Sequence, residues 1–184
     1  RIETKTIMEI ALPMTKDKTA LKAARDKAAD TLAGTLEKGL DIAFVTLGDP
    51  MLYATFSYLV PLVKERLPDV RVEAVPGITS FCAAACAAML PLAEGSERVA
   101  IVPAAYDLEG VRQALKTSDT VILMKVNKMI DGIVELLEEE SLLNNAVFVS
   151  RISWPDAEII TDLNTLKGRD VGYFSLIIVK KGLI

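Results

Sequence analysis

Residues 43–53 read Ala43-Phe44-Val45-Thr46-Leu47-Gly48-Asp49-Pro50-Met51-Leu52-Tyr53, and they indicate the fold class better than any other stretch. An apolar segment typical of a buried strand ends at Gly48, and a helical pattern begins a few residues later. In an α/β protein, ligands bind beside the carboxyl ends of the strands. Glycine lets the chain turn and lets a ligand approach the backbone, and Pro50 fixes the exit from the turn. The stretch therefore predicts an α/β fold with a candidate ligand-binding loop.

The same order of elements recurs at Val75-Pro76-Gly77-Ile78-Thr79-Ser80. If the strands before the two loops are parallel, both loops lie at one edge of a sheet and offer free backbone N–H groups at a helix N-terminus. Thr79 and Ser80 stand where side chains either cap a helix or bind a ligand. Each loop alone also fits an ordinary turn. Neither contains GxGxxG or GxxxxGK[ST], so ordinary dinucleotide or nucleotide-phosphate binding is not indicated. As a pair, the loops favour a small-molecule site.

Short apolar runs alternate with amphipathic windows along the rest of the chain, which predicts an α/β protein with mostly parallel strands. A first apolar run covers 7–14; the expected strands are 41–46, 70–75, 98–102, 120–126 and 146–152, and the expected helices are 17–38, 53–67, 78–90, 108–116 and 129–140. Residues 157–161 and 171–181 are expected to form an antiparallel hairpin, which makes the C-terminal sheet mixed. The polar segment 91–97 predicts a boundary between an N-terminal domain, 1–93, and a C-terminal domain, 94–184.

The composition excludes several classes of function. The chain has 184 residues, 51% of them hydrophobic, and a net charge of −4, which argues against a nucleic-acid-binding protein. Its apolar runs are too short to span a membrane and we see no signal peptide, so a cytoplasmic location is expected. The sequence has no histidine, which rules out Ser-His-Asp and Cys-His hydrolysis and His-ligated zinc catalysis. Cys82 and Cys86 lie four apart in an alanine-rich helix and are expected to be buried. No metal site is expected, because the chain has no histidine and no other cysteine to supply further ligands.

The two loops together, Gly-Asp-Pro-x-x-Tyr and Val-Pro-Gly-Ile-Thr-Ser, resemble those of the tetrapyrrole methylases, which are S-adenosylmethionine-dependent enzymes of corrin and sirohaem synthesis. Residues 47–58 are similar in particular to the precorrin-2 (or cobalt-factor II) C(20)-methyltransferases, and residues 12–17, 123–126 and 173–181 agree. The resemblance implies two α/β domains with the active site in a cleft between them, usually in a homodimer. It also implies methyl transfer to carbon 20 of precorrin-2 or cobalt-factor II in cobalamin biosynthesis, with S-adenosylhomocysteine as the product of the cofactor.

The resemblance further implies which residues of this chain form the site. The implied cofactor contacts are Leu47, Gly48, Asp49, Leu52, Thr79, Ser80, Met124, Ile152 and Ser175. Asp49 and Tyr53 are the candidate catalytic residues for proton transfer, although Tyr53 could instead only shape the cleft. The substrate carries several carboxylates, so cationic groups are expected around it, and the candidates are Lys16, Lys125, Lys128 and Arg151.

One feature departs from the family pattern. The family begins with a strand that ends in a glycine-rich G-x-G-P-G-D loop, whereas no glycine precedes Gly34 here. The N-terminal domain is therefore expected to be incomplete, without one member of its sheet and without that wall of the substrate site. Two alternatives stay open: a sister methylase that acts at another ring position or on diphthine, and a truncated α/β module that binds a ligand or dimerises without catalysis.

Overall fold

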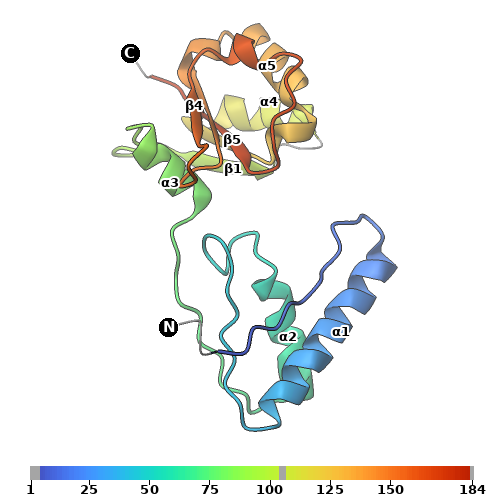
Figure 1. Ribbon diagram of the computed structural model, residues 1–184. Helices are drawn as coiled ribbons and strands as arrows, with labels where there is room; N and C mark the ends of the chain where they lie inside the picture. Colours follow the sequence, from blue (N-terminus) through green and yellow to red (C-terminus); the bar gives the residue numbers. More distant parts are fainter. Residues whose placement is uncertain (1–4, 104–106, 183–184) are drawn as a thin grey trace. The chain divides into compact units, whose positions relative to one another are not determined.

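The chain divides into two compact units, Arg1–Ile78 and Thr79–Ile184 (Figure 1). The computed structural model describes residues 5–103 and 107–182, and each unit is described by itself. The division comes earlier than residue 93, where the sequence pattern predicts it. Helix α3 (Ser80–Ala87) packs against strand β5 (Ser175–Lys180) and so belongs to the second unit. In the described ranges, no helix has the length and apolar character that crossing a membrane requires.

The first unit is built on two helices, α1 (Lys18–Leu36) and α2 (Phe56–Arg66), which pack side by side (Figure 1). The Asp17 carboxylate starts α1 by accepting hydrogen bonds from the N–H groups of the first turn. The contact between the helices buries small and aliphatic side chains, namely Ala28, Ala29, Leu32, Leu59 and Val63. Because alanine lets the helix backbones approach closely, this small core holds the two helices that frame the loops.

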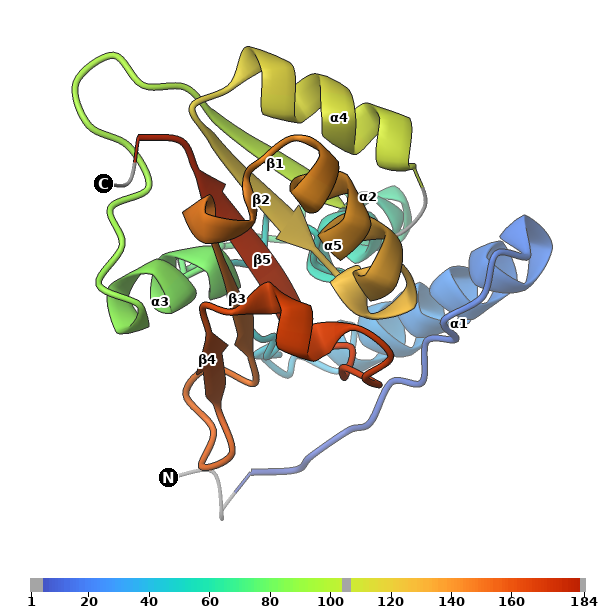
Figure 2. The same ribbon diagram turned by 90° about the horizontal axis from the view of Figure 1, so that it is seen from above.

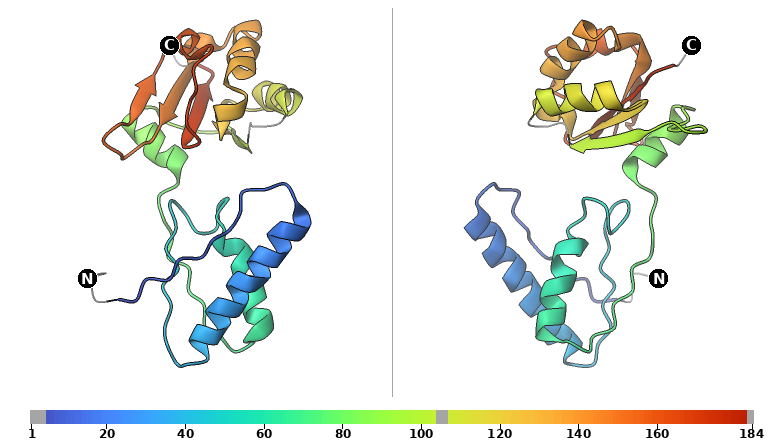
Figure 3. Two further views of the ribbon diagram at one scale, coloured as in Figure 1. Left: turned by 45° about the vertical axis from the view of Figure 1, so that its right-hand side comes forward. Right: turned by 180° about the vertical axis from the view of Figure 1, so that it is seen from behind.

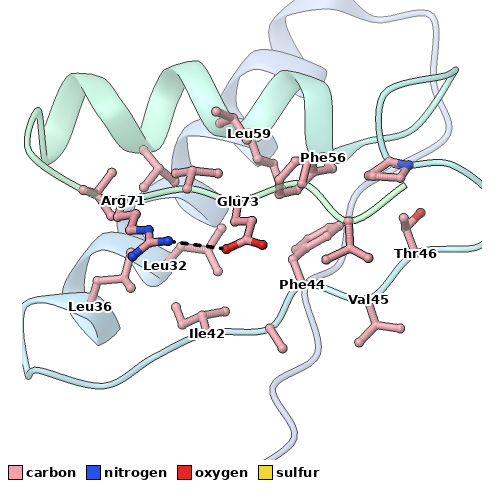
Figure 4. Close-up of a pocket in the computed structure, with 18 of the residues that line it drawn as sticks. Leu32, Leu36, Ile42, Phe44, Val45, Thr46, Phe56, Leu59, Arg71 and Glu73 are labelled. Atoms are coloured by element: carbon pink, nitrogen blue, oxygen red, sulfur yellow. Dashed lines mark ion pairs between the residues drawn. The ribbon is translucent and has the colours of Figure 1, made fainter. Parts of the chain in front are cut away.

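The extended segments of this unit form no sheet, so the strands predicted at 41–46 and 70–75 are wrong. Residues 41–46 still alternate between exposed and half-buried positions, as a strand does, but no described residue of the unit is assigned to a strand. A groove of about 640 Å³ is lined by both segments and by α1 and α2 (Figure 4). A strand exists only when a neighbour pairs with its backbone, and the two segments face each other across this groove instead of pairing.

The second unit contains a five-stranded sheet in the order β1-β2-β5-β3-β4. Its strands are β1 (Val99–Pro103), β2 (Thr120–Met124), β3 (Ala146–Ser150), β4 (Glu158–Ile160) and β5 (Ser175–Lys180). Strands β1 and β2 are parallel and all other pairs are antiparallel. The mixed sheet is confirmed, whereas the mostly parallel arrangement and the terminal hairpin are wrong. Every residue of β5 is buried, so β5 takes the centre between β2 and β3, and the short, half-exposed β4 takes the edge.

Helices α4 (Leu108–Thr117) and α5 (Ile130–Glu139) cover one face of this sheet, and α3 lies on the opposite side (Figures 2 and 3). The 3₁₀ turns η2 (Val126–Lys128), η3 (Leu143–Asn145) and η4 (Leu163–Leu166) complete the connections. The core under α4 and α5 includes Val111, Ile133, Leu137, Phe148 and Ile177. These side chains recur at helical spacing in α5 and at alternate positions in β5, which is why the sequence pattern locates them.

Cys82 and Cys86 are exposed, which corrects the expectation that they are buried. The buried face of α3 is formed instead by Phe81, Ala84 and Ala85. Residues four apart share a helix face, and Phe81 with Ala85 occupies the face that packs inward because the larger aromatic side chain gains more from burial. The two cysteines lie together on the other face.

Candidate functional site

The two loops found in the sequence meet in the first unit. A Cβ atom placed on Gly77 would lie 2.2 Å from the carbonyl oxygen of Gly48, so only glycine allows this approach. Gly48 itself has a φ of 75°, in the left-handed region that glycine enters without steric cost. The two glycines therefore let the backbones of the two loops touch.

The Asp49 carboxylate ties the loops together. Its Oδ1 accepts a hydrogen bond from the N–H of Met51 at 2.8 Å, within its own turn. Its Oδ2 accepts one from the N–H of Gly77 at 3.1 Å, across to the second loop. Both carboxylate oxygens are thus engaged with backbone donors, and this arrangement suits a residue that holds the shape of the loops.

The other predicted residues of the first unit lie on the same loop. Leu47 is 71% exposed and Tyr53 is 49% exposed, and Tyr53 has a φ of 51°, which few residues other than glycine adopt. Leu52 is half-buried, and its N–H points to the carbonyl of Asp49. Lys16 is exposed and precedes α1. Large apolar side chains exposed on a tight loop are typical of a surface that becomes covered by a ligand or another segment.

Thr79 and Ser80 stand at the start of the second unit, at the N-terminus of α3. The Thr79 hydroxyl accepts a hydrogen bond from the N–H of Cys82 at 3.3 Å, so Thr79 is the N-cap of the helix. Ser80 is exposed in the first turn. A threonine N-cap still has its O–H available as a donor, so capping and ligand contact are compatible.

Three predicted residues meet at one end of the sheet in the second unit. Met124 ends β2 opposite Leu176 of β5, and Ser150 ends β3 opposite Ser175. Ile152 follows in the turn after β3 and is half-buried. The Ser175 hydroxyl donates a hydrogen bond to the carbonyl of Gly172 at 2.6 Å and is buried. The sheet topology thus brings Met124, Ile152 and Ser175 to the same end of the sheet, although they are far apart in sequence.

Two of the four candidate cations lie at the same end of the sheet. Lys125 follows Met124, and Arg151 precedes Ile152; both have left-handed backbone conformations, with φ of 58° and 49°. The Nε of Arg151 forms an ion pair with Asp156 at 2.6 Å, and this guanidinium holds the pKa of the Asp156 carboxyl below its usual value. Lys128 lies in η2 and is exposed. The second unit thus places positive charge beside the ends of its strands.

The sequence pattern did not indicate the role of Gly77 in the first unit or of an aromatic group in the second. Gly77 lies within the Val75–Ser80 motif, yet its role as the contact point appears only in the structure. Trp154, Tyr173 and Phe174 form an aromatic group beside Ile152 and Ser175, with Phe174 within 5.4 Å of both other rings, centroid to centroid. The signal for the aromatic group is that Trp154 is the one tryptophan of the chain and follows two positions after a candidate contact. Nowhere in residues 5–103 and 107–182 do three or more His, Cys, Asp or Glu side chains gather as a metal site.

Comparison with known proteins places these loops in context. A family model described as tetrapyrrole (corrin/porphyrin) methylases matches residues 2–167. The chain is 34% identical to a probable cobalt-precorrin-2 C(20)-methyltransferase of Methanocaldococcus jannaschii, over 98% of this chain and 75% of that protein. It is also 34% identical to the cobalt-precorrin-2 C(20)-methyltransferase of Salmonella typhimurium, over 92% of this chain and 70% of that protein.

A solved structure shows the same fold. Uroporphyrin-III C-methyltransferase from Thermus thermophilus, crystallised with S-adenosylhomocysteine, superimposes with a TM-score of 0.61 and 19% identity, covering 89% of this chain and 80% of that chain. At this identity the likeness concerns the fold alone. It agrees with the α/β class and with the mixed sheet of the second unit.

Proposed function

Because the chain belongs to the tetrapyrrole (corrin/porphyrin) methylase family, we propose that it transfers a methyl group from S-adenosylmethionine to carbon 20 of precorrin-2 or its cobalt-containing counterpart, in cobalamin biosynthesis. The names of its relatives at 34% identity support the substrate class and the carbon position. The observation that carries the proposal is the contact of Gly77 and Asp49 across the two loops. Each loop motif alone is weak evidence for a ligand site, and this contact joins the two loops into one structure.

The cofactor supplies a methyl group on a positively charged sulfur. The macrocycle carbon forms a new C–C bond while the S–CH₃ bond breaks, so the sulfonium becomes a neutral thioether and the methylated carbon then loses a proton. The protein must hold the two reacting atoms in line, and such positioning supplies a large part of the rate. The backbone groups around Gly48 and Gly77 are fixed by the Asp49 carboxylate, which suits that task.

We assign the cofactor contacts within each unit. In the first unit they are Leu47, Gly48, Asp49 and Leu52, and in the second Thr79, Ser80, Met124, Ile152 and Ser175. Because both oxygens of Asp49 accept backbone hydrogen bonds, its proposed role is to keep the loops in shape. Tyr53, on the same loop, is then the better candidate for moving the proton, because its hydroxyl can accept the proton from carbon while it passes its own to water. We also propose a homodimer that works in the cytoplasm; light scattering of the purified chain and cell fractionation test those two points.

Calorimetry with S-adenosylhomocysteine tests the cofactor assignment. Asp49→Ala removes both acceptors and should weaken binding on the order of tenfold or more, because buried or loop-closing carboxylate hydrogen bonds contribute about 1.5–3 kcal/mol. Thr79→Val, which keeps the shape and removes the hydroxyl, should also weaken it. Asp17→Ala is the matched control, since this carboxylate likewise accepts two backbone N–H groups but caps α1. Unchanged affinity in Asp49→Ala would refute the loop assignment.

The methyl position separates this proposal from its neighbours. Incubation with precorrin-2, and separately with the cobalt-containing compound, should give a product one methylene unit heavier with the new methyl group on carbon 20. A methyl group on another carbon would indicate a sister methylase, and methylation of diphthine would indicate a different substrate class. Binding of S-adenosylhomocysteine without any transfer would favour a ligand-binding module.

A further inference from the structure

Three large rings gather on the surface of the second unit, at the end of the sheet where Met124 and Ser175 lie. Trp154, Tyr173 and Phe174 are 38%, 41% and 49% exposed. Phe174 lies 5.4 Å from Trp154 in a tilted arrangement and 5.4 Å from Tyr173 edge to face, measured between ring centroids. We call these three side chains the aromatic platform. Aromatic side chains of this size are normally buried, so an exposed group of three indicates a binding surface.

Cations lie over two of the three rings. The guanidinium carbon of Arg151 lies 4.1 Å from the centroid of the Trp154 ring, and the Nζ of Lys125 lies 5.7 Å from that of Tyr173. Both distances are in the range of a cation–π interaction. Arg151 is also paired with Asp156, whose side chain is 62% exposed, so this ion pair is open to solvent and to a further carboxylate. The platform thus combines apolar ring surface with positive charge held against two of its rings.

Three backbone hydrogen bonds hold this surface in place. The N–H of Arg151 donates to the carbonyl of Phe174 at 2.9 Å, and that of Trp154 donates to the carbonyl of Arg151 at 3.0 Å. The N–H of Lys125 donates to the carbonyl of Ser175 at 3.1 Å. Lys125 and Arg151 are in the left-handed region, which is unusual for residues other than glycine and is often found at functional sites.

From this combination we propose that the aromatic platform is the surface on which the second unit receives the tetrapyrrole, with Trp154 against the macrocycle and Arg151 and Lys125 facing its peripheral carboxylates. The inference rests on the proposed function, since it names the part of the chain that binds that substrate. A tetrapyrrole is flat, conjugated and acidic, and each property has a counterpart here: ring surface for stacking, and a guanidinium able to hold a carboxylate through two hydrogen bonds. The adenine ring of the cofactor is also flat but has no carboxylates, so two cations favour the macrocycle.

The test measures two affinities in the same variants. Precorrin-2, kept anaerobic, is titrated by the change in its absorbance, and S-adenosylhomocysteine is titrated by calorimetry. Trp154→Ala should weaken tetrapyrrole binding on the order of tenfold and leave S-adenosylhomocysteine binding within about twofold. Trp154→Phe keeps an aromatic ring and should restore most of the affinity. Arg151→Gln should weaken tetrapyrrole binding too, and more strongly at low salt than at high salt, because a charge interaction is lost.

A matched control exists in the first unit. Arg25 lies 4.0 Å over the ring of Tyr58, which is 51% exposed, so this is a similar cation–ring pair away from the platform. Tyr58→Ala should leave both affinities unchanged. Circular dichroism of each variant checks that the sheet is intact.

The outcomes separate the two proposals. If Trp154→Ala weakens both ligands equally, the platform holds the adenine ring and the inference is overturned. If the variant binds the tetrapyrrole as the wild type does, the platform is not used, while the proposed function stands. If the wild-type chain binds neither ligand, the proposed function fails and the inference fails with it.

Discussion

At the scale of single residues, Gly77 has the tightest constraint in the first unit. A methyl group there would lie 2.2 Å from a backbone oxygen and 3.0 Å from the adjoining carbon, so the chain itself must move. Gly77→Ala should therefore lower the free energy of unfolding of the first unit by about 1–3 kcal/mol. It should also weaken S-adenosylhomocysteine binding. The measurement is a urea titration followed through the NMR signals of α1 and α2, together with calorimetry.

Gly34→Ala is the control for this prediction. Gly34 lies inside α1, and a Cβ there meets no atom within 4 Å. Alanine is favoured over glycine in a helix by about 0.5–1 kcal/mol, so this variant should be more stable than the wild type and should bind equally well. If the two substitutions have the same effect, the close contact of the loops is not what Gly77 provides.

The ion pair of Lys180 and Glu97 makes the stability of the second unit depend on pH. The Nζ of Lys180, in a side chain only 5% exposed, donates to the Glu97 carboxylate at 2.6 Å. This hydrogen bond, and a second from the N–H of Glu94, lowers the pKa of Glu97 below its ordinary value of 4.5. A carboxyl with a lowered pKa contributes stability above its unfolded pKa and loses it as the pH falls through the folded pKa.

Glu97→Gln should therefore lower the Tm near neutral pH, because the buried ammonium loses its charged partner. As the pH falls below about 4.5, the wild type should lose stability more steeply than the variant, so the two Tm values converge. Thermal unfolding followed by circular dichroism between neutral pH and pH 3 measures this. Parallel curves over the whole range would contradict it. Glu94→Gln is a suitable control, because Glu94 contributes its backbone N–H to this site and keeps it in the variant.

At the scale of elements, the helices were predictable and the strands of the first unit were not. The pattern predicts helices at 17–38 and 129–140, and the structure has α1 at Lys18–Leu36 and α5 at Ile130–Glu139. A helix satisfies its backbone within itself, so local sequence is enough to indicate it. A strand needs a neighbour, and residues 41–46 alternate correctly yet have no partner. For the same reason the central position of β5 could not be predicted: its place between β2 and β3 depends on long-range pairing that periodicity does not specify.

Hydrogen exchange tests the unpaired state of these segments. Backbone amides of residues 42–46 and 71–75 should exchange with deuterium within seconds to minutes, because no strand pairing protects them. Amides of β2 and β5, which are paired on both sides and buried, should be among the slowest in the chain. Slow exchange at 42–46 would mean that these segments pair in solution.

The proposed site residues come from two kinds of signal, and their roles stay predictions. The sequence locates Gly48 and Asp49 because a turn after an apolar run is a local signal, and the resemblance supplies Met124, Ile152 and Ser175. The contact at Gly77 could not be predicted, because it depends on how two loops 28 residues apart in sequence come together. The aromatic platform also depends on sheet order, since Trp154 follows β3 and Phe174 precedes β5.

At the scale of the whole molecule, the two units differ in how they are held together. The second unit has a buried sheet whose core includes Phe148, Leu137 and Ile177, all fully buried. The first unit has a core made mainly by two helices, and its loops are fixed by backbone hydrogen bonds to one carboxylate. The function proposed for the chain therefore draws on residues at one end of the sheet in one unit and on a glycine contact in the other.

The groove of the first unit has a consequence for how the protein behaves when it is concentrated. Extended segments with unpaired N–H and C=O groups beside apolar side chains are templates for strand addition between molecules, which leads to aggregation. Val45 stands on such a segment at the border of the groove and is 86% exposed. Val45→Lys should reduce aggregation, since charged residues on open edges oppose strand pairing. Beyond the mass of the proposed dimer, light scattering should show an apparent mass that rises with concentration for the wild type and less for the variant. A mass that stays at that of the dimer in both would exclude this form of association.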